Sequence, residues 1–189
     1  LFLYFLPALV EKTPRFAPAN AGYGGTDYTI RHGHVGLGSY FQCWPGLHYL
    51  GATMVEVTHL NPVALLMGFP IVFELICLPI LYLILNRVSE DKRIVWIGLW
   101  LYYVAGWINR AYYSAQAYGF LLFLLITMVM LSSVLRRNRT LSIERNAVPL
   151  ILIILFLAIA IGHLLSSIVA AIGLVILYIL LRLFKIEGT

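Results

Sequence analysis

Polar side chains are scarce in this sequence, so those that lie outside the basic clusters are candidates for chemistry. Asp27 is the only aspartate between residues 11 and 61, and Arg31 follows it four residues later. A carboxylate flanked by aromatic residues suits a general base that takes a proton from an acceptor hydroxyl or amide, and a guanidinium can bind phosphate through two hydrogen bonds. Two alternatives stay open: Thr26 or Asp27 could cap a helix N-terminus, and Arg31 could simply pair with Asp27.

A second polar group lies between two apolar runs, at residues 109–116. It offers hydrogen-bond donors for a phosphate and a sugar at Asn109, Arg110, Ser114 and Gln116. Tyr112 and Tyr113 are typical of an interfacial aromatic belt. His163 separates the last two apolar runs, with Ser166 and Ser167 one turn further along. We therefore expect Arg110, Gln116 and His163 to contribute to binding a phosphorylated sugar donor.

The histidines and cysteines do not form a recognisable metal pattern. The spacing of His32 and His34 puts two imidazoles on one side of a strand but on opposing sides of a helix, and no Cys, His or carboxylate follows at a suitable offset. Cys43 falls in a polar segment and Cys77 in an apolar one, which disfavours a disulfide. We predict no metal site and expect no cofactor, while the question of a divalent metal stays open.

Glu74 lies near the middle of the apolar segment 62–85. An acid within a membrane span is costly and by default marks function. Glu74 could be a proton or ion coupling site, or it could be protonated and hydrogen-bonded to a neighbouring helix. Both interpretations stay open.

The composition defines the elements that must position these residues. With 61% hydrophobic and 11% charged residues, the chain is neither a soluble globule, nor disordered, nor a disulfide scaffold. We predict an all-α, polytopic membrane protein with about six transmembrane helices in one domain, residues 1–189. Residues 1–10 form a truncated first span, 11–61 an outer loop, and 62–185 five further spans, at 62–85, 94–108, 117–135, 147–161 and 164–184. Because the chain begins inside an apolar run without methionine, we expect a fragment.

The segment 45–60 is too short and too polar for a span. Leu47, Leu50, Met54, Val57 and Leu60 form one apolar stripe at helical spacing. Such an amphipathic helix lies in the membrane interface, so we predict a juxtamembrane helix within the outer loop.

The net charge of +5 reflects topology and does not indicate a nucleic-acid partner. Basic residues cluster between apolar runs, without the basic and aromatic stripe of a nucleic-acid surface. With an interfacial helix at 45–60, nine of 13 basic residues fall on one side, which is then cytoplasmic. If that helix crossed the membrane, the count would be more biased still, and loop 136–146 would be cytoplasmic in both cases. The interfacial arrangement places Asp27, Arg110 and His163 together on the outer face.

Several short motifs resemble the N-terminal half of GT-C membrane glycosyltransferases of the dolichyl-phosphate-mannose protein mannosyltransferase type. Asp27-Tyr-Thr-Ile-Arg-His-Gly-His34 resembles the first loop, where an acid precedes an I-x-x-G-H segment. Tyr40-Phe-Gln-Cys-Trp-Pro-Gly-Leu-His-Tyr49 resembles the start of the juxtamembrane helix. Residues 110–116 resemble the polar outer turn after the third span, and Gly162-His163-Leu-Leu-Ser166 resembles an H-P-L-T turn.

This resemblance implies that Asp27 is the catalytic base and that the juxtamembrane helix lies flat on the outer leaflet. It implies a polyprenyl-phosphate sugar as donor, a protein or glycan as acceptor, and membrane lipids as surroundings. We expect a multi-pass protein in the plasma membrane of a prokaryote. Two alternatives are a transporter or lipid flippase that uses Glu74, and a non-catalytic membrane subunit. A transporter predicts an internal repeat, but the long loop and the Glu74 segment have no second copy in the sequence.

Overall fold

The structure is a computed structural model that describes residues 6, 9–11, 14, 16–36, 38, 44–106, 112–134 and 147–183. Within these ranges the chain forms seven helices and no strand, which confirms the all-α prediction. The helices are α2 (Ala17–His32), α3 (Pro45–Thr58), α4 (Pro62–Val88), α5 (Lys92–Gly106), α6 (Ala115–Val134), α7 (Ala147–Gly162) and α8 (Leu164–Leu183). Most of the predicted first span, at 1–10, and the basic loop 136–146 lie outside the described residues.

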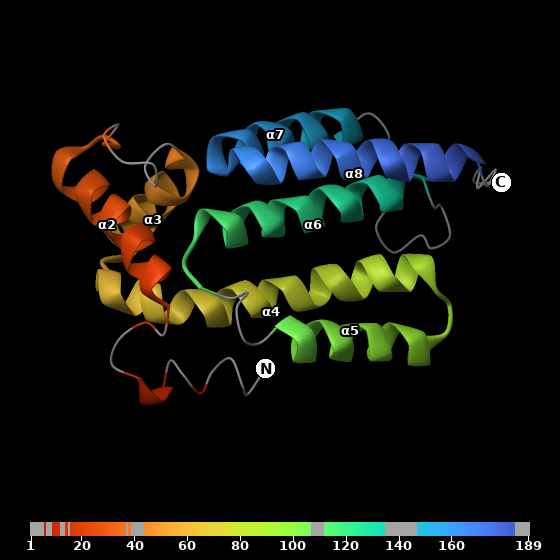
Figure 1. Cartoon of the computed structure of the whole chain (residues 1–189), viewed down its shortest axis with the longest axis horizontal. Coiled ribbons are helices and arrows are strands. Elements are labelled where there is room, and N and C mark those ends of the chain that lie inside the picture. The colour runs from red at the N-terminus through yellow and green to blue at the C-terminus, as the bar shows by residue number, and fades with distance from the viewer. Residues whose placement is uncertain are drawn as a thin grey trace.

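The helices α4 to α8 run side by side, and α2 and α3 pack together at one end of this bundle (Figure 1). Helix α6 contacts α4, α7 and α8, while α3 contacts α4, α6 and α7. Helices α4, α6 and α8 all begin at the end covered by α2 and α3 (Figure 1). We call the α2–α3 pair the cap of the bundle.

Two of the described helices are long and apolar enough to cross a membrane: α4 and the segment Ala115–Ser133 of α6. Helix α7 and the segment Leu164–Leu180 of α8 are shorter apolar helices. Length and composition alone do not distinguish a span from the core helix of a soluble protein. The six spans predicted from the sequence are therefore not confirmed.

Helix α2 is the main departure from the predicted outer loop. Pro18 stands in its first turn, and Gly33 ends it in a left-handed conformation, with φ of 72° and a hydrogen bond from Gly33 N to Thr29 O. Both features are typical of helix ends. The sequence pattern did not predict this helix, because its buried face consists of glycine, alanine and threonine and lacks large apolar residues. Thr26 and Asp27 lie well inside α2, so the prediction that one of them caps a helix is wrong.

Helix α3 confirms that the segment after Pro45 is helical, although it ends at Thr58 and His59 follows with a φ of 54°. The predicted apolar stripe is divided in the structure. Leu47 is buried at 1% exposure and packs in the cluster with Tyr113, whereas Leu50, Met54 and Val57 are exposed. The inner end of α3 thus anchors the cap, and its outer part presents apolar side chains outward.

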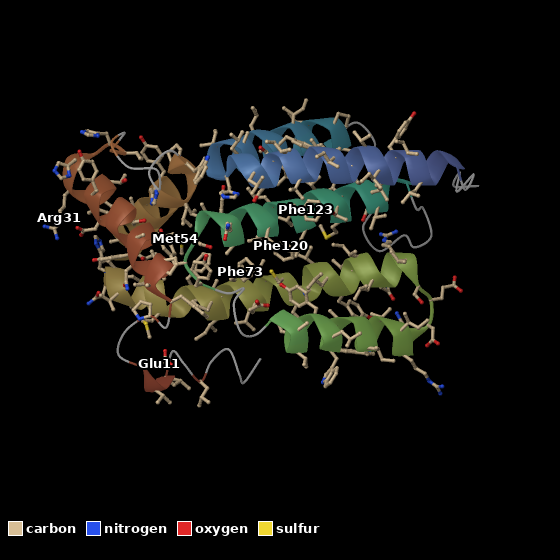
Figure 2. All side chains as sticks on the ribbon, in the orientation of Figure 1. Glu11, Arg31, Met54, Phe73, Phe120 and Phe123 are labelled. Atoms are coloured by element: carbon tan, nitrogen blue, oxygen red, sulfur yellow. The ribbon has the colours of Figure 1, made fainter. Side chains whose placement is uncertain are left out.

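The bundle core lies on both sides of α6. Phe73 and Cys77 of α4 pack with Ala117 and Leu124 of α6, and Phe120 packs against this cluster. Figure 2 shows Phe73 and Phe120 in the layer between α4 and α6. On the opposite side, Ile126 of α6 packs with Ile159 of α7 and Ala170 of α8.

Candidate functional site

A cavity of about 510 Å³ lies where the cap meets the beginnings of α6 and α8. We call it the end cavity. The cap and the segment just before α3 contribute Pro18, Gly22, Trp44, Leu47 and His48. The other lining residues are Tyr112, Ser114, Ala115 and Gln116 at the start of α6, and His163, Leu164, Leu165 and Ile168 at the start of α8.

The start of α6 presents hydrogen-bonding groups to this cavity. The Ser114 hydroxyl oxygen accepts a hydrogen bond from Ala117 N at 3.1 Å and so caps the helix. The Tyr112 hydroxyl donates to Oε1 of Gln116 at 3.3 Å. Because that bond occupies the amide oxygen, Gln116 can offer its NH₂ group, which carries two donors, to a ligand.

His163 caps α8 and lines the same cavity. Its Nδ1 accepts a hydrogen bond from Ser166 N at 3.2 Å and lies 2.7 Å from the Ser166 hydroxyl. A ring nitrogen that accepts from a backbone N–H carries no proton, so the neutral ring holds its proton on Nε2. Burial lowers the pKa of His163, in accordance with this neutral form. Trp44 meets the ring edge-on, with ring centroids 4.9 Å apart.

Two helix N-termini therefore converge on one cavity. Each N-terminus carries the equivalent of about half a positive charge from the helix dipole, and free backbone N–H groups there bind anions. Gln116 and the neutral His163 add side-chain donors. The electrostatics of this end of the cavity therefore favour an anionic or strongly accepting ligand group.

A different part of the lining is apolar. Leu164, Leu165 and Ile168 follow His163 on the first turns of α8 and are 55%, 59% and 48% exposed. The cavity thus continues onto the outward apolar face of α8. An amphiphile with a polar head and a hydrocarbon tail matches this combination of polar and apolar lining.

A buried hydroxyl pair ties the cap to the bundle beside the cavity. The hydroxyls of Thr26 and Tyr113 lie 2.7 Å apart, and Tyr113 also donates to Leu47 O at 3.2 Å. Burial raises the pKa of Tyr113 to about 12, although the hydrogen bond with Thr26 acts in the opposite direction. Tyr113 is 2% exposed, so it is a core residue of the structure, which the sequence-based interpretation of Tyr112 and Tyr113 as interfacial aromatic residues did not anticipate. No pattern in the sequence distinguishes it from Tyr112.

The structure brings two of the predicted donor-binding residues, Gln116 and His163, to the same cavity. Asp27 and Arg31 are not among the residues that line it. They form an ion pair on α2, with Nε of Arg31 2.8 Å from Oδ2 of Asp27 and side-chain exposures of 70% and 30% for Arg31 and Asp27. Figure 2 shows Arg31 at the outer edge of the cap, pointing away from the bundle. Arg110 lies outside the described residues.

Glu74 lies away from the end cavity. It is fully buried in α4. The Tyr103 hydroxyl of α5 donates a hydrogen bond to the backbone oxygen of Glu74 at 2.8 Å. A buried acid facing other helices is the arrangement expected for Glu74 if α4 spans the membrane. Either role considered for it remains a prediction.

Within the described ranges, His, Cys, Asp and Glu side chains form no group of three or more that could hold a metal ion. Cys77 is buried in the α4–α6 core, and Cys43 lies outside those ranges. Comparison with models of protein families, with curated proteins and with solved structures finds no match for this chain. The site's own geometry therefore carries the functional argument.

Proposed function

We propose that this chain forms the donor-binding part of a membrane glycosyltransferase, which moves a sugar from a polyprenyl phosphate to a protein or glycan acceptor on the outer face. The observation that carries the proposal is the end cavity, in which two helix N-termini, Gln116 and His163 adjoin the exposed apolar start of α8. The phosphate would lie among the donors. The polyprenyl chain would follow α8 into the lipid.

The exposed surface of the bundle supports membrane embedding. Only 28% of the most apolar stretch of α4 is buried, and only 39% of that of α6. Helices α7 and α8 expose rows of large apolar residues at helical spacing, namely Leu150, Ile153, Leu157 and Ile161 on α7, and Ile168, Ile172, Ile176 and Ile179 on α8. Water-soluble proteins rarely leave contiguous apolar surface of this kind. Acyl chains would cover it in a bilayer.

The proposed reaction is a single displacement at the anomeric carbon of the donor sugar. Asp27, which does not line the end cavity, is assigned as the base from the sequence alone: it would accept the proton of the acceptor hydroxyl or amide at the cavity mouth, and the acceptor atom forms a bond to that carbon. The bond between the carbon and the phosphate oxygen breaks, and the polyprenyl phosphate leaves with the electron pair. Donors at the starts of α6 and α8 stabilise the charge that develops on this phosphate.

In this scheme Arg31 holds the Asp27 carboxylate through their ion pair and does not bind the donor phosphate. The acceptor would approach along α2, whose Pro18 and Gly22 line the cavity. Arg110, which precedes the described start of α6, is proposed as a further phosphate ligand on the basis of the sequence. The scheme uses no cofactor.

The test uses the full chain in lipid nanodiscs and a photoreactive polyprenyl phosphate. We expect His163→Asp to reduce specific labelling about tenfold or more, because a carboxylate in the cavity repels phosphate. Aspartate is also a good N-cap, so this variant keeps α8 intact. The matched control His163→Asn supplies a neutral cap through its amide oxygen and an N–H donor in place of Nε2–H, so it should label within about threefold of the wild type.

A second arm measures sugar transfer. Asp27→Asn should lower the transfer rate about 10²- to 10⁴-fold, the usual contribution of a general base, while lipid labelling stays unchanged. Equal labelling of the His163→Asp and His163→Asn variants would refute the donor site. Normal transfer by Asp27→Asn would refute the assigned base.

A further inference from the structure

His32 and His34 lie side by side at the end of α2, although their spacing would separate them on a continuous helix. The helix ends at His32, and Gly33 takes a left-handed conformation with a φ of 72°. The chain therefore turns back, which places the His34 ring 6.2 Å from the His32 ring and 5.7 Å from the Tyr28 ring, measured between centroids. The expectation that this spacing places the two rings on opposing sides of a helix does not apply, because the helix ends before His34.

The hydrogen bonds of both rings leave the same nitrogen available. Nδ1 of His32 lies 2.9 Å from Tyr28 O, and Nδ1 of His34 lies 3.3 Å from Val35 O. A carbonyl oxygen only accepts, so Nδ1 donates in each ring, and the neutral imidazole then carries its lone pair on Nε2. Histidines that bind metals characteristically donate their other ring N–H to such a carbonyl oxygen.

We infer that His32 and His34 together bind one divalent transition-metal ion, such as Zn²⁺, Ni²⁺ or Cu²⁺, through their Nε2 atoms. Metal–nitrogen bonds of about 2.0–2.1 Å allow two imidazole centroids that share one ion to lie up to about 6.4 Å apart. The observed 6.2 Å falls just within this limit. At 6.2 Å the two Nε2–metal bonds would lie close to a straight line, so a tetrahedral ion, which needs centroids about 5.2 Å apart, would draw the exposed His34 ring about 1 Å toward His32.

The surroundings favour binding at this position. Tyr28 stacks on His32 with centroids 4.1 Å apart and an interplanar angle of 18°, which restricts the rotation of that ring. Both histidines are exposed, so an ion can reach them from water. The positive charge of nearby Arg31 is balanced by its ion pair with Asp27. With two protein ligands, the remaining coordination positions take water or a group from a bound ligand.

This inference does not depend on the proposed glycosyl transfer. It is tested by calorimetric titration of Zn²⁺ into the detergent-solubilised full chain, purified through a tag without histidine. We expect one Zn²⁺ per chain, and His32→Asn and His34→Asn should each weaken binding about tenfold or more, because the second ligand otherwise binds as an intramolecular group. The double variant should show no specific Zn²⁺ binding, because neither ligand of the single ion remains.

His59→Asn is the matched control, because His59 is also an exposed histidine at a helix end, where His59 itself has a left-handed backbone, but it has no described aromatic ring partner. It should leave Zn²⁺ binding unchanged, and Mg²⁺ should not bind, because imidazole suits zinc, nickel and copper. Electron spin resonance of bound Cu²⁺ should show two imidazole nitrogens. Unchanged Zn²⁺ affinity in either single variant, or equal loss in His59→Asn, would overturn the inference.

Discussion

At the scale of single residues, one ring nitrogen of His163 links helix stability to protonation. Nδ1 accepts the hydrogen bond from Ser166 N that caps α8, and it can do so only while it carries no proton. Protonation would break this bond and add a positive charge at the positive end of the helix dipole. Both effects agree with the lowered pKa that burial imposes on His163.

Stability should therefore fall as the pH falls below about 6.5, the ordinary pKa of histidine. Between that pH and the lowered pKa of folded His163, the unfolded chain binds the additional proton, so stability rises with pH in this window. The loss should reach about 1 kcal/mol, the usual contribution of an N-cap. It is measured as the thermal unfolding midpoint in detergent across pH 5 to 8, with Asn at position 163 as the control.

The His163→Asn variant keeps a capping oxygen that does not titrate in this range. Its pH dependence reports the other histidines of the chain, and the difference between the two curves isolates His163. Parallel curves for the wild type and the variant would contradict a capping role that depends on the neutral ring.

At the scale of elements, the contact of α2 with α3 depends on small residues in α2. A Cβ atom built on Gly25 would lie 2.4 Å from Cε1 of His48, which is buried. A Cβ atom on the adjacent Gly24 would meet nothing within 4 Å. Two neighbouring glycines in one helix thus have different roles: one permits close packing, and the other only lowers helix propensity.

Alanine substitutions at these two positions should have opposite effects. Gly24→Ala should stabilise the protein by up to about 1 kcal/mol, the difference in helix propensity between the two residues. Gly25→Ala should destabilise it by about 1–3 kcal/mol, the usual cost of overpacking, because His48 must move. Chemical unfolding of the full chain in detergent measures both, and equal effects of the two substitutions would refute the packing described for the cap.

The same small residues explain why α2, unlike α3, was difficult to predict. Helix prediction relies on large apolar residues at helical spacing, and α2 uses Ala19, Gly22, Gly25 and Thr26 on its buried face. In contrast, α4 was predicted from its long apolar run at 62–85, and in the structure Asn61 caps its start by accepting a hydrogen bond from Val63 N at 2.8 Å.

At the scale of the whole molecule, the apolar residues divide between a modest core and an extensive exposed surface. Val72 of α4, Ile153 of α7 and Ile172 of α8 are 52%, 58% and 55% exposed, whereas Arg31 of the cap is a charged exposed residue. A bilayer around the long helices, with the cap in water, would match both surfaces.

Spin labels at these positions distinguish lipid from water. In nanodiscs, labels introduced separately at 72, 153 and 172, after serine replaces the two native cysteines, should collide with dissolved oxygen more than with a water-soluble nickel chelate. A label at 31 should show the reverse, because oxygen concentrates in the hydrocarbon region and a charged residue favours water. Preferential collision of the first three labels with the nickel chelate would contradict membrane embedding.

The sequence alone was sufficient to predict the all-α class and the approximate bounds of α3 to α8, because large apolar runs and the apolar stripe at 45–60 are local features of the chain. It also identified Gln116 and His163 as residues near one another.

The tertiary structure decided which polar groups share a site. The end cavity joins residues from four separate segments, whereas Asp27 lies beside Arg31 on a helix that the pattern did not reveal. Tyr113 and the His32–His34 pair depend on side-chain packing and on the conformation of one glycine, and neither leaves a periodic signal in the sequence.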